Sequence, residues 1–178
     1  MIIGVVSDSH GDIESLKAML RYPEAAQAEM WLHAGDYAAD ADALEELTGK
    51  RVERVLGNCD LPMDGTYDET VVEACDFFVD GVHDETVVEV AGHRIFLTHG
   101  HLFNVRFDTA MLAAAAREAG ADIAVYGHTH IALYEQQGDV TVVNPGSVAR
   151  PRDAAAGSFM VISLTAGEEP TMNLIRLR

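Results

Sequence analysis

Apolar residues recur at strand spacing and at helix spacing in turn through the first 56 residues. Residues 2–7 form a short apolar run that is typical of a buried strand, whereas Leu16 and Met19 repeat along one helix face. That helix is predicted to begin at Asp12, its N-cap, and to stop before Pro23. The order strand–helix–strand predicts a parallel βαβ arrangement. The predicted elements are strands at 2–7, 30–34 and 52–56 and helices at 12–22 and 40–47.

The second half of the chain is richer in strands, which are separated by short turns. Ala91-Gly92 and Gly138-Asp139 are typical turn dipeptides, and Gly120 is expected to end an alanine-rich helix. This order favours a mixed β-sandwich with helices outside, built as a single domain over residues 1–178. The predicted elements are a helix at 110–119 and strands at 86–90, 93–98, 123–126, 131–136, 140–143, 158–165 and 171–177.

A short repeat and a long connection lie between these halves. The sequence of residues 68–73 recurs at 84–89, either as two similar strands at one sheet edge or by coincidence in an acidic, valine-rich chain. The segment Leu61 to Glu85 contains Phe77-Phe78 and is predicted to form an edge hairpin packed on the core. The alternatives for this segment are a wall of a substrate pocket or a subunit contact.

The charge balance limits the range of partners. The chain has 29 acidic and 12 basic residues, a formal net charge of -17, and only two lysines, Lys17 and Lys50. Self-repulsion of this kind is relieved by salt, which leads to the hypothesis of a halophilic protein adapted to high intracellular salt. The alternative is an ordinary acidic protein. A face for a nucleic-acid duplex is not expected, because no basic stripe is present to neutralise phosphates.

Targeting and redox features predict a cytoplasmic protein. No signal peptide is recognised at the N-terminus, and no apolar stretch approaches the ~18 residues of a membrane span. Cys59 and Cys75 do not have the spacing of a disulfide framework or of a zinc site. A structural zinc protein with a closed, cysteine-rich site is therefore not expected.

Polar clusters follow five of the predicted strands. Ligand sites of α/β sheets gather beyond the carboxyl ends of the strands, so these clusters are expected to converge. Five of the eight histidines belong to them. The clusters are Asp8-Ser9-His10, Gly35-Asp36, Gly57-Asn58-Cys59-Asp60, His99-Gly100-His101 and Gly127-His128-Thr129-His130.

The chemistry of these clusters suits a pair of divalent metal ions. Carboxylate, amide and imidazole ligands favour manganese, iron, zinc, nickel or cobalt over calcium. In Asp-x-His and His-x-His, alternate side chains of an extended segment point to the same side. Taken singly, each cluster has a simpler explanation, such as a helix N-cap region, packing histidines or a turn at Asn58. Only the ordered combination predicts a metal centre.

The ordered set of motifs resembles the calcineurin-like metallophosphoesterases, and most closely their small, single-domain phosphodiesterase branch. The resemblance runs from Ile2 to about Ser147 and includes Asn144-Pro145-Gly146-Ser147. It implies a four-layer α-β-β-α sandwich in which two mixed sheets are flanked by helices. It also implies two divalent ions, with manganese as the first choice, and attack on phosphorus by a hydroxide that bridges them.

The resemblance assigns ligands to both ions, with Asp36 shared between them. Asp60 is expected to orient a histidine ligand or the neighbouring loop. The first ion would be held by Asp8, His10, Asp36 and His130, and the second by Asp36, Asn58, His99 and His128.

One position departs from the wider family. Many members have a histidine after the asparagine, as general acid or phosphate ligand, where this chain has Cys59. A thiol with a pKa near ~8.5 is a poor substitute for a protonated imidazole, so His101 becomes the candidate proton donor. Arg150 and Arg152 follow the last motif and either reach a substrate phosphate or lie in a solvated loop.

The remaining residues are assigned simpler roles. His33, His83 and His93 are expected to be structural or exposed, and Cys75 to be a small core residue. The overall prediction is a phosphodiesterase acting on a small phosphate ester, with a phosphomonoesterase as the alternative. The retromer subunit of similar fold serves mainly as a scaffold and has lost metal ligands, whereas this chain keeps the full set. Family resemblance is also compatible with a homo-oligomer.

Overall fold

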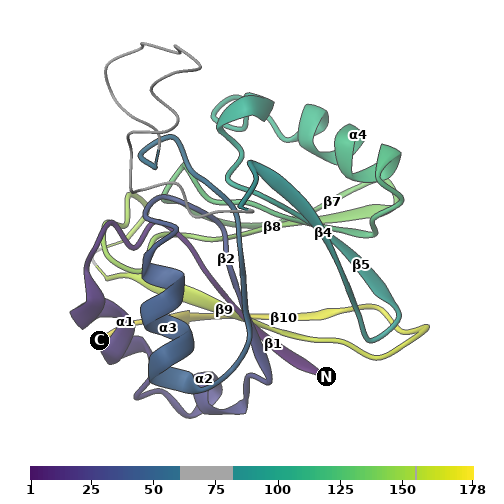
Figure 1. Cartoon of the computed structure of the whole chain (residues 1–178). Coiled ribbons are helices and arrows are strands. Elements are labelled where there is room, and N and C mark those ends of the chain that lie inside the picture. The colour runs from purple at the N-terminus through teal and green to yellow at the C-terminus, as the bar shows by residue number, and fades with distance from the viewer. Residues whose placement is uncertain (61–81, 155) are drawn as a thin grey trace.

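Two five-stranded sheets stack face to face in the computed structural model, which describes residues 1–60, 82–154 and 156–178 (Figure 1). The first sheet has the strand order β10-β9-β1-β2-β3. Its central strand β1 pairs in parallel with β2 and antiparallel with β9. The strands are β1 (Ile2–Val6), β2 (Met30–His33), β3 (Val52–Arg54), β9 (Ser158–Ser163) and β10 (Thr171–Arg176).

The second sheet has the order β4-β5-β6-β8-β7 and is also mixed. Strands β5, β6 and β8 run in parallel, while β4 and β7 close the edges as antiparallel partners. The hairpin turn between β4 and β5 falls at Ala91-Gly92, where both residues have positive φ. The strands are β4 (Glu85–Val90), β5 (His93–Thr98), β6 (Ile123–Val125), β7 (Ala132–Gln137) and β8 (Val140–Pro145).

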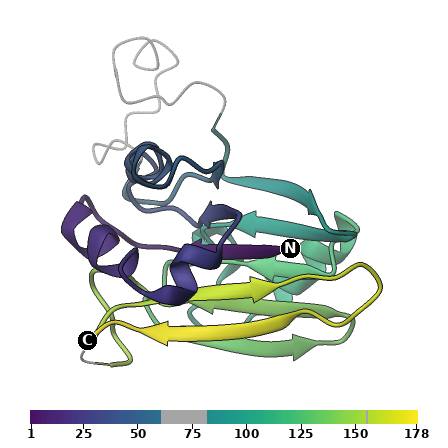
Figure 2. The ribbon, with the colours of Figure 1, turned by 90° about the horizontal axis from the view of Figure 1, so that it is seen from below.

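The main core lies between the sheets because alternate strand residues face inward. Ile3 and Val5 of β1 meet Ile95 and Leu97 of β5 in this layer, and all four are fully buried. The opposite face of the first sheet presents Trp31 to α1 (Ile13–Met19), α2 (Pro23–Gln27) and α3 (Asp40–Thr48). Figure 2 looks onto this face, with the purple helices α1 and α2 in front of the sheet.

A second helical layer covers the other sheet. The helix α4 (Ala110–Glu118) buries Leu112 and Ala116 against Phe96 and Val142, on the outer face of β5 and β8. The predicted four-layer α-β-β-α sandwich of two mixed sheets is thereby confirmed, as is the parallel arrangement of β1, β2 and β3.

The helix predicted at 12–22 was too long. Asp12 does cap α1, where its carboxylate accepts hydrogen bonds from the Ser15 amide at 3.0 Å and the Ser15 hydroxyl at 2.7 Å. The helix ends at Met19, however, and Pro23 begins α2, a helix that the sequence pattern did not predict. Proline suits the first turn of a helix because its φ is already helical and its missing N–H needs no partner there.

Several predictions fall on residues outside the described ranges. These are the first copy of the repeat at 68–73, Cys75 and most of the segment Leu61 to Glu85. The second copy of the repeat forms most of β4. Within the described ranges, none of the helices has the length and apolar character needed to cross a bilayer.

Candidate metal centre

The polar clusters meet at one end of the two sheets because each follows the carboxyl end of a parallel strand. Asp8 follows β1, Asp36 follows β2, His99 follows β5 and His128 follows β6. The loops after β1 and β6 pass close to each other at Gly127, where a Cβ would lie 1.9 Å from Ser7 Oγ. Only glycine allows the loop after β6 to approach the loop after β1 this closely.

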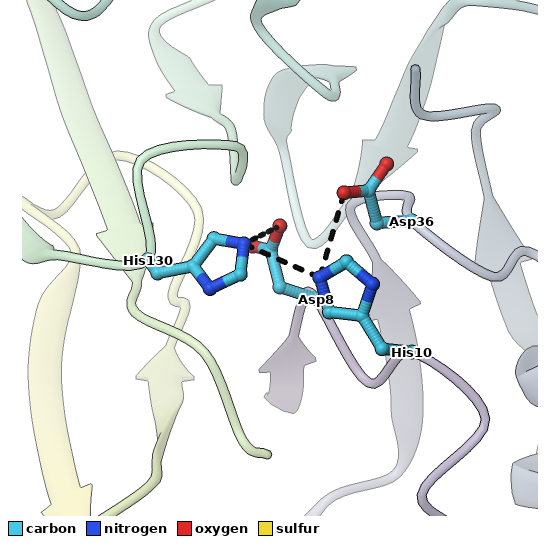
Figure 3. A group of neighbouring side chains, drawn as sticks. All are labelled: Asp8, His10, Asp36 and His130. Atoms are coloured by element: carbon cyan, nitrogen blue, oxygen red, sulfur yellow. Dashed lines mark hydrogen bonds and ion pairs between the residues drawn. The ribbon is translucent and has the colours of Figure 1, made fainter. Parts of the chain in front are cut away.

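Four side chains form the first half of the centre: Asp8, His10, Asp36 and His130 (Figure 3). One donor atom from each lies within 4.8 Å of the corresponding atoms of the other three. His130 Nε2 lies 3.2 Å from Asp8 Oδ1 and 3.3 Å from His10 Nε2, and His10 Nε2 lies 3.6 Å from Asp36 Oδ2. Two carboxylates and two imidazoles at these distances are a donor set for a divalent cation.

The second half of the centre begins at the other oxygen of Asp36. His99 Nε2 lies 3.2 Å from Asp36 Oδ1, and the His99 and His128 rings meet edge to face with centroids 5.2 Å apart. The backbone N–H of Cys59 also donates to Asp36 Oδ1, at 2.9 Å. The two oxygens of Asp36 therefore face different histidines, an arrangement that suits a carboxylate shared by two ions.

Backbone carbonyls set the tautomers of the two buried histidines. His99 Nδ1 lies 2.7 Å from the carbonyl of Ala34, and His130 Nδ1 lies 2.6 Å from that of Arg150. A carbonyl can only accept, so each Nδ1 carries a proton and each ring directs its Nε2 toward a carboxylate. With Nδ1 occupied in this way, Nε2 is the ring atom of each histidine that could bind a cation shared with the facing carboxylate.

Unpartnered polar atoms support the same conclusion. Among the described residues, Asp8 Oδ1, His99 Nε2 and His101 Nδ1 are buried side-chain atoms of the centre without a hydrogen-bond partner. The contacts of Asp8 Oδ1 and His99 Nε2 with neighbouring ring or carboxylate atoms are close but lack hydrogen-bond geometry. Because a buried polar atom without a partner is destabilising, these residues fit metal ligation better than a purely structural role.

The backbone of the centre is also unusual. Positive φ is uncommon outside glycine, although Asp, Asn and His tolerate it better than most residues. Such conformations gather at functional sites, where the surrounding structure holds them in place. Five of the predicted ligands adopt it: Asp8 (φ 55°), His10 (φ 49°), Asp36 (φ 56°), His128 (φ 66°) and His130 (φ 59°).

The electrostatics keep most of these histidines neutral. Burial lowers the pKa of His10 and His101, and burial together with the charges of His99 and Arg106 lowers the pKa of His128 to about 4. Burial also opposes the protonation of His130, but the Asp8 carboxylate outweighs it and raises the pKa of that ring. Neutral imidazole is the form that binds metal.

The loop Gly57–Asp60 places its residues differently. Asn58 is exposed, and its amide lies 3.4 Å from Cys59 Sγ rather than against His99. Asp60 accepts from the N–H groups of Ala38 at 2.8 Å and Gly57 at 2.7 Å, so it braces this loop and the one after β2. Of the two roles expected for Asp60, the structure shows contacts for loop positioning and none with a described histidine.

Cys59 is exposed but lies close to Asp36. Desolvation, followed by a hydrogen bond to Asp36, raises the pKa of its thiol to about 11. The thiol therefore keeps its proton at neutral pH and is a weak acid. His101 lies in the short 3-10 turn η1 (His101–Phe103), with its ring 5.5 Å from His99 and 6.3 Å from His128.

The other histidines and arginines that the sequence singled out lie outside the ligand clusters. His33 is fully buried and its Nε2 lies 2.9 Å from Ser9 Oγ, while His93 contacts Asp122 at 2.5 Å on the far side of the fold. Arg150 and Arg152 are exposed beside the loop that holds His130.

The sequence motifs assigned no role to Asn144 and Ser147 and did not include Arg106. Asn144 donates to the carbonyl of Gly127 at 2.7 Å and Ser147 donates to that of Asp8 at 2.8 Å, so the motif after the last ligands ties two ligand loops together. Arg106, whose Nε donates to His128 Nε2 at 2.9 Å, lies in no motif. The only signal in the sequence was the scarcity of basic residues, which makes each one near these clusters a candidate.

Comparison with known proteins identifies the family. A model of the calcineurin-like phosphoesterase superfamily domain matches residues 1–167. The chain belongs to this superfamily. A probable metallophosphoesterase of Methanothermobacter thermautotrophicus is 34% identical over 179 residues, which cover 99% of this chain and 92% of the relative. Phosphodiesterase YfcE of Escherichia coli is 30% identical over 168 residues, which cover 86% and 82% of the two chains.

The fold is also found in a solved structure with zinc bound. The structure of Vps29 from Entamoeba histolytica in complex with zinc superposes with a TM-score of 0.69 at 19% identity, with 100% of both chains covered. At this identity the likeness establishes the fold alone. The family match, the relatives and the shared fold together show that the chain is a metal-dependent phosphoesterase of the small YfcE/Vps29-like branch.

Proposed function

We propose that this phosphoesterase hydrolyses small phosphodiesters at a centre of two divalent metal ions. The observation that carries the proposal is the position of Asp36, whose two oxygens face His10 on one side and His99 on the other. One shared carboxylate between two sets of imidazoles supports two adjacent cation sites. The E. coli relative is named a phosphodiesterase, which favours the diester over the monoester.

The residues of the chain divide into two groups of proposed ligands. When bound, the metal pair supplies positive charge for the phosphate and an activated water for attack on phosphorus. Asp8, His10, Asp36 and His130 would hold the first ion, and Asp36, Asn58, His99 and His128 the second. For Asn58, this role requires its exposed side chain to turn inward from its contact with Cys59.

His101 remains the proposed proton donor to the leaving oxygen, a role that requires the negative charge of a bound phosphate to offset the burial that lowers the pKa of its ring. Its half-buried ring lies beside His99 and His128, whereas the thiol of Cys59, with a pKa of about 11, releases its proton poorly. Asp60 is proposed to act through the loop that carries Asn58 and Cys59, which it braces against the loop of Asp36.

Hydrolysis of bis(p-nitrophenyl) phosphate beside p-nitrophenyl phosphate, in molar KCl with manganese, tests the proposal. We expect turnover of the diester that stops on chelation and returns when manganese, nickel, zinc, iron or cobalt is added. Turnover of the monoester alone would establish a phosphomonoesterase instead. Folded protein that turns over neither ester with any of these metals would overturn the enzyme proposal in favour of a metal-binding scaffold.

The acidic surface leads to a further expectation. At a net charge of -17, we expect the thermal unfolding midpoint to rise by about 5 °C or more between 0.1 M and 2 M KCl, because the Debye length falls from about 10 Å to about 3 Å or less. Sorbitol at matched osmolality controls for general solute effects. A midpoint that stays flat or falls with KCl contradicts a halophilic adaptation.

The choice of manganese, a cytoplasmic setting and a homo-oligomer are parts of the same proposal. Manganese is supported by the mixed oxygen and nitrogen donors of the centre. Metal analysis of the purified protein and light scattering in high salt would test the metal and the oligomer directly.

A further inference from the structure

Arg106 lies on an anchored segment at the rim of the centre. The segment follows η1, where the Phe103 ring packs edge to face on Phe96 with centroids 5.8 Å apart, and Val105 is buried in the core beneath α4. Asn104 takes a left-handed conformation between them. These contacts fix the backbone, so the exposed Arg106 side chain extends from a defined position toward His128.

The partner of Arg106 is unusual in so acidic a chain. Across the described residues, six basic side chains pair with a carboxylate: Lys17, Arg51, Arg54, Arg94, Arg117 and Arg176. Arg106 makes no such pair with a described residue, and its Nε donates to the imidazole of His128 at 2.9 Å. A guanidinium that contacts a ring instead of a carboxylate keeps its charge uncompensated by these contacts and is available for an anion.

The contact with His128 excludes metal binding by the same ring. A neutral imidazole has one N–H and one lone pair, and Arg106 uses the lone pair on Nε2. If a cation took Nε2, it would displace the guanidinium directly. If a cation took Nδ1, the proton would move to Nε2 and two donors would face each other. Either way, ligation by His128 releases Arg106 within reach of the centre.

We propose that Arg106 is a substrate-binding residue that exchanges between two partners: it holds the His128 ring before the second metal binds and the substrate phosphate afterwards. The inference rests on the proposed function, since it takes His128 as a ligand of the second ion. A guanidinium suits the task because its planar donors match two phosphate oxygens. In a chain with a net charge of -17, it also supplies positive charge for an anionic substrate.

Two titrations of the Arg106→Gln variant test the exchange without any turnover. The matched control is Arg21→Gln, which removes the same charge from an exposed position between α1 and α2. In a calorimetric titration with manganese, Arg106→Gln should bind the weaker ion several-fold more tightly than wild type. In a titration of the manganese-loaded protein with inorganic phosphate, it should bind about tenfold more weakly. The Arg21→Gln protein should match wild type in both.

The outcomes separate this inference from the proposed function. Phosphate affinity in Arg106→Gln within twofold of that in Arg21→Gln overturns the role in binding phosphate. Manganese affinity that does not rise in Arg106→Gln overturns the exchange at His128. Both readouts are equilibrium binding, so they decide the role of Arg106 whether or not the wild-type protein hydrolyses diesters. Failure of that hydrolysis refutes the proposed function alone.

Discussion

Asp36→Asn is expected to lower kcat for bis(p-nitrophenyl) phosphate on the order of 10³-fold. Its carboxylate is the one group that faces both halves of the centre, with Oδ2 3.6 Å from His10 and Oδ1 3.2 Å from His99. An amide offers one oxygen and no negative charge, so one ion loses a ligand atom and both ions lose the shared negative charge. Calorimetry with manganese should show weaker binding at both sites, and steady-state assays should show the loss in kcat.

The control for Asp36→Asn is Asp42→Asn, the same change at an exposed carboxylate of α3 that pairs with Arg54. Its turnover should equal that of wild type. The folded state of Asp36→Asn should also persist, because the amide oxygen can still accept from the Cys59 N–H. Retention of more than about a tenth of the wild-type kcat would show that Asp36 does not bridge two ions.

Gly57→Ala is expected to disrupt both the centre and the fold around it. A Cβ on Gly57 would lie 2.3 Å from the backbone nitrogen and from Oδ1 of Asp36, and neither atom can retreat from its buried position. Overpacking of this kind typically destabilises a protein by about 1–3 kcal/mol. Displacement of Asp36 should also lower diester turnover by about 100-fold or more. Urea unfolding and initial rates measure the two effects.

Gly49→Ala is the control for Gly57→Ala, because it strains the backbone without disturbing the metal centre. Gly49 ends α3 with a φ of +64°, and a Cβ there meets no atom within 4 Å. Alanine at that φ should destabilise the fold by about 1 kcal/mol and leave turnover unchanged. If Gly57→Ala hydrolysed diesters as fast as Gly49→Ala, the approach of its loop to Asp36 would be irrelevant to catalysis.

The layers of the fold followed from the sequence because strands with two buried faces and helices with one apolar face have distinct patterns. Trp31 and Leu32 illustrate this, since the adjacent residues of β2 point to opposite cores. The missed helix at Pro23 spans only five residues, too few for a periodic pattern to identify. Its proline resembled a stop signal, and only the path of the chain reveals that it begins a helix.

The candidate ligands were predictable because their motifs follow strands whose ends must meet. The supporting contacts were not, since they depend on backbone atoms that carry no residue signature. The carbonyl of Ala34, which sets the tautomer of His99, is an example. Arg106 was missed for a related reason, because its partner His128 is 22 residues away and no spacing rule connects them.

The left-handed backbone at five of the predicted ligands has a consequence for how such a chain can change over evolutionary time. Each of these residues carries an energetic penalty on the order of 1 kcal/mol that a glycine would not. The metal-free fold therefore stores strain in these loops, and a bound metal would offset it by mass action. A descendant freed from selection for hydrolysis would gain robustness by losing these side chains. Selection for function, rather than for stability, would be needed to keep these side chains in place.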